Sequence, residues 1–254
     1  MDINLALILT LLTAFTGLVV AFDRFYLQKK KAADGSPNRA MNTLVDYSRS
    51  FFPVLLFVLV IRSFVFEPFR IPSGSMMPTL LQGDYIFVKK YSYGLRLPVL
   101  ETKIVETGKP ERGDVVVFRL PEDPSVNYIK RVVGLPGDTV EYVNHRLTIN
   151  GEPVSLAPDP DPPTDDSTPR FVETLGEREH AILIAHPGNT VRDGVYRVRE
   201  GHYFMLGDNR DNSKDSRFLG EIPETHLVGE AVRIWMHMDG LELPDWDRIG
   251  TRIE

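Results

Sequence analysis

Cysteine is absent from this chain of 254 residues. Disulfide bonds, thiolate nucleophiles, cysteine-ligated zinc and iron–sulfur clusters are therefore excluded, although the absence does not select a cellular compartment. Positive charge is also in deficit, because 29 Lys and Arg stand against 35 Asp and Glu, for a formal net charge of −6. This balance argues against a protein that binds nucleic acid.

The first apolar segment has no charge at all. Residues 3–22 are uncharged, and a helix of this length spans roughly 30 Å, the thickness of a bilayer core. Only Asp2 precedes the segment, whereas a cleavable secretory signal carries positive charge before its apolar part. We therefore predict a retained transmembrane helix at residues 1–22, with a buried core helix as the alternative.

A second apolar segment, residues 51–66, is shorter and contains Arg62. An arginine at mid-membrane costs about 2.5–3.5 kcal/mol, but one near the end of a span can reach the interface. Pro53 stands in the first turn, where proline is tolerated. We predict a second transmembrane helix at residues 51–67, with an interfacial helix as the alternative.

Basic residues gather between the two segments. The predicted linker, residues 23–50, contains Arg24, Lys29, Lys30, Lys31, Arg39 and Arg49. Positive charge beside a span favours the cytoplasmic side of the membrane. Two spans then place everything after about residue 67 on the outer face.

The outer part is predicted to be mainly β, sandwich-like or barrel-like. It shows no internal repeat and no long helical period. Runs rich in β-branched and aromatic residues, separated by Gly-Asp or Asn-Gly turns, predict strands at residues 85–89, 114–120, 128–133, 140–143, 147–149, 202–206 and 230–236.

A smaller β lobe is predicted within this part. Residues 140–199 are more polar than their neighbours, so we expect an inserted lobe there and a core formed by residues 68–139 and 200–254. Residues 157–170 contain five prolines and four aspartates and are predicted to be a solvated loop.

Ser75 is the candidate nucleophile. It lies in a Ser-Gly-Ser turn between Pro72 and Pro78, shortly after the second apolar segment. A serine that attacks a peptide or ester needs a base to take its proton. The histidines lie in no nucleophile-elbow or His-Glu-x-x-His context, although a Ser-His-Asp arrangement remains open; they are His145, His180, His186, His202, His226 and His237.

Lys130 is the other candidate base. The run 128–133 reads as a strand, in which Tyr128, Lys130 and Val132 share one face. A base must be neutral, which requires the lysine pKa to fall by roughly three units, equivalent to about 4 kcal/mol; burial can supply this shift. The neighbouring Arg131 cannot act as a base, because guanidinium does not deprotonate in proteins. The alternative is an ordinary lysine on a surface strand.

Four segments together resemble bacterial type I signal peptidase, also called leader peptidase. They are residues 72–79, 112–118, 128–138 and the polar loop 207–217. The resemblance covers about residues 68–138 and 203–235 together with the two predicted spans.

The resemblance implies a Ser/Lys dyad. Ser75 is then the nucleophile and Lys130 the general base. Ser73 and the Ser75 backbone N–H would bind the oxyanion, and Ser213 would hydrogen-bond the Lys130 amine.

Other positions follow from the same resemblance. Asp215 and Arg217 would form a supporting ion pair. The resemblance also implies an apolar substrate pocket, which admits only small side chains on steric grounds, with walls at Phe69, Ile71, Pro72, Met76, Leu80, Ile86, Val117, Tyr128 and Ile129.

As a signal peptidase, the protein would cut exported preproteins after small residues of the Ala-x-Ala type. It would be a multi-pass protein of the bacterial cytoplasmic membrane, with the catalytic part on the outer face, contacting membrane lipid and the protein export channel. No metal, cofactor or nucleic acid is expected. Two other hypotheses fit parts of the sequence: a non-catalytic exported β-module that binds peptides, and a cytosolic self-cleaving Ser/Lys protease.

Overall fold

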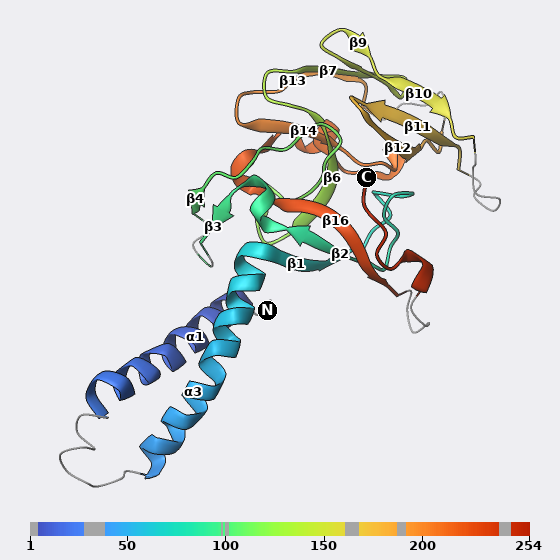
Figure 1. Ribbon diagram of the computed structural model, residues 1–254. Helices are drawn as coiled ribbons and strands as arrows, with labels where there is room; N and C mark the ends of the chain where they lie inside the picture. The colour runs from blue at the N-terminus through green and yellow to red at the C-terminus, as the bar shows by residue number, and fades with distance from the viewer. Residues whose placement is uncertain are drawn as a thin grey trace. The chain divides into compact units, whose positions relative to one another are not determined.

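The computed structural model describes residues 5–27, 39–97, 99, 102–160, 168–186, 192–238 and 245–254 (Figure 1). The chain divides into two compact units. The first comprises Met1–Phe66 and Gly94–Glu106, and the second comprises Glu67–Tyr93 and Thr107–Glu254. The two apolar segments belong to the first unit, and the β-rich part belongs to the second.

Two long helices make up most of the first unit. Helix α1 (Leu5–Phe22) continues through a π-helical turn (Asp23–Leu27), and α3 (Arg39–Val60) continues through another (Ile61–Val65). The helices lie side by side (Figure 1). A short hairpin completes the unit and is formed by β3 (Leu95–Arg96) and β4 (Lys103–Val105).

Helix α3 begins earlier than predicted. It starts at Arg39 rather than at residue 51 and takes in residues 39–50 of the predicted linker. Residues 40–52 contain neither glycine nor proline, so the polar residues before the apolar segment remain helical. Both helices are long and apolar enough to cross a membrane, over Leu5–Tyr26 and Met41–Val65.

A seven-stranded sheet forms the centre of the second unit. In spatial order its strands are β1 (Phe66–Arg70), β2 (Asp84–Lys89), β16 (Leu227–His237), β5 (Val115–Arg119), β6 (Asn127–Gly134), β14 (His202–Leu206) and β15 (Ile222–Pro223). Valine, isoleucine and aromatic residues dominate the longer strands and pack well on a pleated surface. The prediction of a mainly β fold is therefore confirmed.

Two smaller sheets occupy the segment predicted as an inserted lobe. One sheet has the order β13 (Gly194–Arg197), β7 (Thr139–Val143), β8 (Arg146–Ile149) and β9 (Glu152–Pro153), and the other has the order β10 (Ser155–Pro158), β11 (Arg170–Leu175) and β12 (Arg178–Leu183). All of these strands lie within residues 139–197, close to the predicted limits of 140–199.

The predicted acidic loop at residues 157–170 is partly strand. Ala157 and Pro158 end β10, where they pair with Val172 and Phe171 of β11. A proline is tolerated here because β10 is an edge strand of its sheet. Residues 161–167 of the expected loop lie outside the described part of the chain.

The core of the second unit lies on both faces of the central sheet. Val115 and Val117 of β5 enter one buried cluster, and Val116 and Phe118 enter another, as the alternation of side chains along a strand requires. The first cluster also receives side chains from the turn that follows β1, namely Ile71, Met76 and Leu80. The core therefore holds this turn in place.

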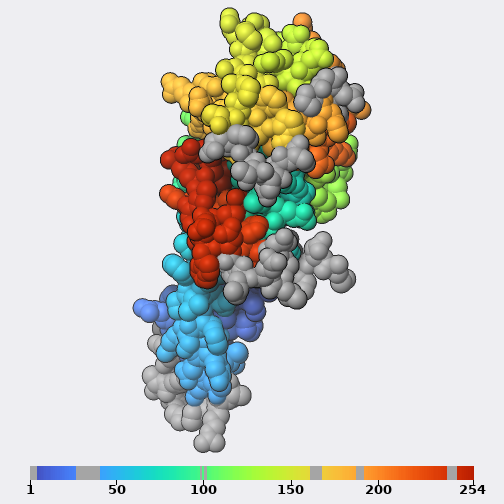
Figure 2. Space-filling model, turned by 90° about the vertical axis from the view of Figure 1, so that its right-hand side faces the viewer, coloured from blue at the N-terminus to red at the C-terminus, as the bar shows by residue number. Residues whose placement is uncertain are grey.

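Short helical turns connect the strands. They are the 3-10 helices Lys90–Tyr93, Arg210–Asn212, Glu224–His226 and Trp246–Arg248, and the α-helix α4 (Ser216–Leu219). The C-terminal residues, red in Figure 2, return to β16, where the Ile253 N–H donates to the Val232 carbonyl at 3.1 Å.

Candidate active site

Ser75 stands on the turn between β1 and β2. Two backbone hydrogen bonds close this turn, from the Met77 N–H to the Gly74 carbonyl at 3.1 Å and from the Leu80 N–H to the Met76 carbonyl at 2.9 Å. Met76 and Leu80 are fully buried, whereas Ser75 is half-buried. The core therefore fixes the turn and leaves the Ser75 hydroxyl accessible.

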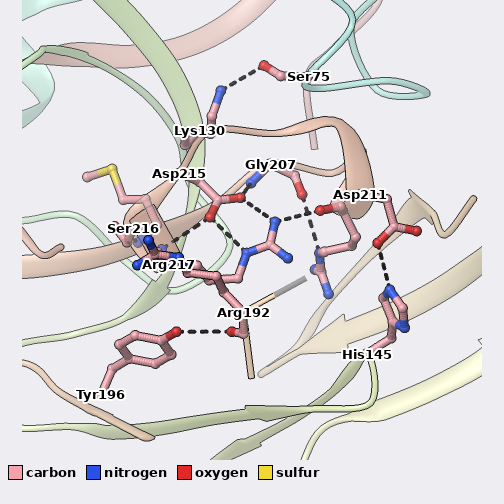
Figure 3. Close-up of polar contacts among 12 residues, drawn as sticks. Ser75, Lys130, His145, Arg192, Tyr196, Gly207, Asp211, Asp215, Ser216 and Arg217 are labelled. Carbon is pink, nitrogen blue, oxygen red and sulfur yellow. Dashed lines mark hydrogen bonds and ion pairs between the residues drawn. The ribbon is translucent and has the colours of Figure 1, made fainter. Parts of the chain in front are cut away.

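Lys130 lies on β6 and points to Ser75. The residue is 2% exposed, and its Nζ donates to Ser75 Oγ at 2.7 Å (Figure 3). Nζ also donates to the Ile129 carbonyl at 2.7 Å. Tyr128 and Val132 both pack in the second of the two core clusters, so the predicted alternation along this strand is confirmed. The structure thus brings the predicted nucleophile and the predicted base into direct contact.

The environment of Lys130 favours the neutral amine. Burial lowers the pKa of Lys130 from 10.5 to about 8, while the carboxylates of Asp215 and Asp208 act in the opposite direction. About one amine in ten is then neutral at pH 7, compared with about one in a few thousand for a free lysine. A neutral amine can accept the Ser75 hydroxyl proton across the same contact, as a general base must.

Ser73 lies on the same turn, and its Oγ is 3.5 Å from Ser75 Oγ. The Ser73 side chain is exposed. A hydroxyl in this position is free to donate to the oxygen that gains negative charge when Ser75 attacks a carbonyl group.

Asp215 and Arg217 form the predicted ion pair in the loop after β14. The two side chains are fully buried and lie 2.8 Å apart. Asp215 also accepts the Gly207 N–H at 3.0 Å (Figure 3). Arg217 donates to the Arg210 carbonyl. The pair closes the loop on itself, near enough to Lys130 for Asp215 to raise the lysine pKa.

The predicted hydrogen bond from Ser213 to the Lys130 amine is not formed. Among the described residues, the buried Ser213 Oγ has no hydrogen-bond partner. A Cβ atom added to Gly207 would clash with this oxygen, so the hydroxyl packs against the Gly207 backbone. Lys130 Nζ is directed instead to Ser75 and Ile129.

Asp208 is a site residue that sequence reasoning missed. Its two oxygens accept from Arg131 Nε at 2.9 Å and Nη2 at 2.7 Å, and Thr79 donates to it as well. Burial raises the Asp208 pKa, but Arg131 outweighs burial and holds it below its usual value. The sequence signal was an arginine on a buried strand, because such a residue requires an acidic partner.

Sequence reasoning also missed Glu173, another buried acidic residue that pairs with a buried arginine. It lies on β11 in the lobe, fully paired with Arg210 through two hydrogen bonds of 2.7 and 2.6 Å. His180 of β12 stands opposite Glu173, with Nε2 at 3.3 Å from the carboxylate. Burial raises the Glu173 pKa, but Arg210 and His180 together hold it well below its ordinary value. These contacts tie β11 and β12 to the loop that follows β14.

The predicted pocket residues do not all lie together. One buried cluster contains Ile71, Met76, Leu80, Ile86, Val117 and Ile129, with Phe69 packed against it. Tyr128 packs instead in the second core cluster, because it shares the strand face of Lys130. Pro72 is exposed at the start of the turn.

The arrangement supplies what acyl transfer by serine needs: a nucleophile, a buried amine beside it and a hydroxyl donor for the oxyanion. Within the described ranges, no group of three or more metal-ligating side chains occurs.

Comparison with known proteins finds relatives along the whole chain. The signal peptidase I of Pseudomonas fluorescens is 44% identical, covering 98% of this chain and 99% of its own. That of Pseudomonas aeruginosa is 43% identical, covering 99% of each chain. A solved signal peptidase I from Enterococcus faecalis is 29% identical and covers 48% of this chain and 96% of its own, at a TM-score of 0.32, too low for an argument about the fold.

The family comparison covers the three segments that form the site. Residues 44–236 match the model described as signal peptidase, peptidase S26. This range includes the turn of Ser75, the strand of Lys130 and the loop after β14. The chain belongs to the signal peptidase family, peptidase S26.

Proposed function

We propose that Ser75 and Lys130 perform the peptide-bond cleavage by which this member of the signal peptidase family removes signal peptides from exported preproteins. The protein is a serine endopeptidase. The observation that carries the assignment is the 2.7 Å contact between Ser75 Oγ and the Nζ atom of a buried lysine.

In the first half of the reaction, Ser75 Oγ attacks the carbonyl carbon of the scissile peptide bond and Lys130 Nζ takes the hydroxyl proton. The carbonyl oxygen becomes an oxyanion, which the Ser73 hydroxyl and the Ser75 N–H stabilise by donating hydrogen bonds. One such donor contributes roughly 3–4 kcal/mol to lowering the barrier. Lys130 then gives the proton to the nitrogen of the leaving chain, the C–N bond breaks, and an ester to Ser75 remains.

In the second half, water attacks the ester and Lys130 takes a proton from it. The oxyanion forms again in the same place, and the C–O bond to Ser75 breaks. Ser75 recovers its proton from Lys130, and the signal peptide leaves with a free carboxylate. The same amine therefore serves as base and acid in both halves.

Selectivity for small residues, of the Ala-x-Ala type, is the second part of the proposal. The large side chains clustered beneath the Ser75 turn, among them Ile71, Met76 and Ile129, support a shallow apolar site. Such a site rejects bulky substrate side chains by steric conflict. The substrate would lie extended beside the strand that precedes Ser75, where backbone hydrogen bonds add affinity.

The third part concerns location. We place the protein in the bacterial cytoplasmic membrane as a multi-pass protein, with the catalytic unit on the outer face. The two helices capable of crossing a membrane and the basic residues between them support this placement. Membrane lipid and the export channel are proposed as neighbours, because substrates still held in the membrane would be locally concentrated.

The test is cleavage of one radiolabelled preprotein by the full-length enzyme purified in detergent. Wild type is expected to release a mature chain whose N-terminal sequence begins directly after a small residue. Ser75→Ala and Lys130→Ala are each expected to leave the preprotein intact, because each removes one half of the dyad.

A matched control is Ser125→Ala, which removes a hydroxyl on an exposed loop of the same unit. It is expected to cleave at the wild-type rate. Continued processing by purified Ser75→Ala and Lys130→Ala would overturn the assignment of the dyad.

A further inference from the structure

Asn209 contacts the backbone on both sides of the Ser75 Cα atom. Its side-chain Nδ2 donates to the Gly74 carbonyl at 3.1 Å, and its backbone N–H donates to the Ser75 carbonyl at 3.1 Å. The residue is 8% exposed. Two hydrogen bonds from one buried residue thus hold two consecutive carbonyl groups of the nucleophile turn.

The bond to Gly74 has a consequence for the oxyanion site. The Gly74 carbonyl and the Ser75 N–H belong to the same planar peptide group and point in opposite directions. A donor that fixes the direction of this carbonyl oxygen therefore also fixes the direction of the Ser75 N–H. That N–H is one of the two donors proposed for the oxyanion.

Asn209 is itself held in place by its neighbours in the loop. The Asp208 carbonyl accepts the Leu183 N–H of β12 at 2.9 Å, and Leu183 forms a parallel bridge with Asn209. The Asp208 side chain is paired with Arg131, and Arg210 is paired with Glu173. Buried charges on either side in the sequence therefore hold Asn209 at a defined position.

We propose that Asn209 is a positioning residue for the oxyanion site: by binding the Gly74 carbonyl, its side chain aims the Ser75 N–H at the charge that develops during attack. This inference rests on the proposed roles of Ser75 and Lys130. The Met77 N–H also donates to the Gly74 carbonyl. Loss of the Asn209 side chain therefore loosens the peptide group without freeing it.

The test uses full-length enzyme in detergent and a fluorogenic peptide that spans a signal-peptide cleavage site. Asn209→Ala is expected to lower kcat about tenfold, less than removal of an oxyanion donor costs, with KM changed less than about twofold. Asn209→Asp keeps the size of the side chain but places a carboxylate against a carbonyl oxygen. Its kcat is expected to fall further than that of Asn209→Ala.

Two inhibitors separate positioning from general damage to the site. A substrate-like peptide aldehyde forms a tetrahedral adduct with serine and needs the oxyanion donors, whereas the corresponding peptide alcohol does not. In Asn209→Ala the inhibition constant of the aldehyde is expected to rise by the same factor by which kcat falls. The inhibition constant of the alcohol is expected to stay within about twofold of wild type.

Asn212→Ala is the matched control, since it removes an exposed asparagine from the same loop. It is expected to match wild type in all four measurements. A wild-type kcat in Asn209→Ala, or equal weakening of aldehyde and alcohol, would overturn the positioning role. Those results leave the dyad standing if Ser75→Ala is inactive, whereas an active Ser75→Ala overturns the proposed function itself.

Discussion

Lys130 is an ionisable residue in a buried position. Because burial lowers its pKa to about 8, the neutral amine that the mechanism needs becomes the main form only above that pH. We expect kcat/KM to rise about tenfold per pH unit below pH 8 and to level off above it. Steady-state cleavage of a fluorogenic peptide between pH 6 and 10 measures this profile. A plateau that begins near pH 6 would contradict it.

The lowered pKa of Lys130 also makes the stability of the folded protein depend on pH. The unfolded chain keeps its lysine proton up to about pH 10.5 and the folded chain only up to about pH 8, so stability rises with pH between these values. Below pH 8 the buried ammonium costs about 3 kcal/mol. Lys130→Met is therefore expected to raise the Tm in detergent at pH 7, with an advantage that shrinks toward pH 10. Lys214→Met, at a lysine 55% exposed, is the control and should leave Tm unchanged.

Sequence reasoning at the residue scale predicted the pair that the structure brings into contact, Ser75 and Lys130, and missed the residues that hold them. Ser75 and Lys130 stand in short patterns whose chemistry is visible locally. Asp208 and Asn209 act on residues far away in the chain, and their roles depend on contacts that only folding creates. The contact expected from Ser213 failed for the same reason, because neighbouring backbone decides which way its hydroxyl points.

The loop after β14 approaches the nucleophile turn so closely that one of its positions has no room for a side chain. A Cβ atom at Gly207 would clash with Ser213 Oγ and lie 2.6 Å from the Ser75 carbonyl oxygen, which is backbone and cannot move aside. Gly207→Ala is therefore expected to push the loop away from Ser75 at a cost of about 1–3 kcal/mol.

The kcat/KM of Gly207→Ala should fall at least about tenfold, because small displacements of catalytic groups slow the reaction. Adding Ser213→Ala relieves the clash with the hydroxyl but not those with Ser213 Cβ and the Ser75 carbonyl, so the double variant is expected to recover stability only in part. Wild-type kcat/KM and Tm in Gly207→Ala would show that the loop can accommodate a Cβ atom at this position, contrary to the prediction.

The buried pair of Glu173 and Arg210 joins β11 to the loop that follows β14. Glu173→Gln leaves the Arg210 charge buried without compensation, which we expect to cost about 3–5 kcal/mol. The control is Glu111→Gln, which breaks an ion pair whose carboxylate is 76% exposed and should cost less than about 1 kcal/mol. Thermal unfolding in detergent compares the two. Equal losses of Tm would contradict the role given to the buried pair.

Element prediction succeeded in runs rich in β-branched and aromatic residues and failed where buried charged residues interrupt such runs. The runs that became β2, β5 and β6 are rich in valine, isoleucine and aromatic residues. Strands β11 and β12 carry Glu173 and His180 at buried positions. In the sequence these polar residues suggest a solvated segment, because the pairing of Glu173 with Arg210 is formed only in the folded chain. The start of α3 was missed because an apolar run marks a membrane span and not the whole helix.

At the scale of the whole molecule, the proposed function requires the basic linker and the catalytic unit to lie on opposite sides of the membrane. Signal peptides are removed from proteins on their way out, so a catalytic unit on the cytoplasmic side would not meet its cleavage site. The absence of native cysteine makes this arrangement measurable, because a single introduced thiol is the sole target of a maleimide.

We expect Glu122→Cys, at a side chain that is 69% exposed in the catalytic unit, to react with a membrane-impermeant maleimide in intact cells. Ser36→Cys, in the sequence between the two predicted spans, should react only after the membrane is permeabilised. Both variants should process preprotein normally, since neither residue is among those proposed for the site. Labelling of Ser36→Cys in intact cells, with Glu122→Cys protected, would reverse the topology and place the dyad where no translocated substrate reaches it.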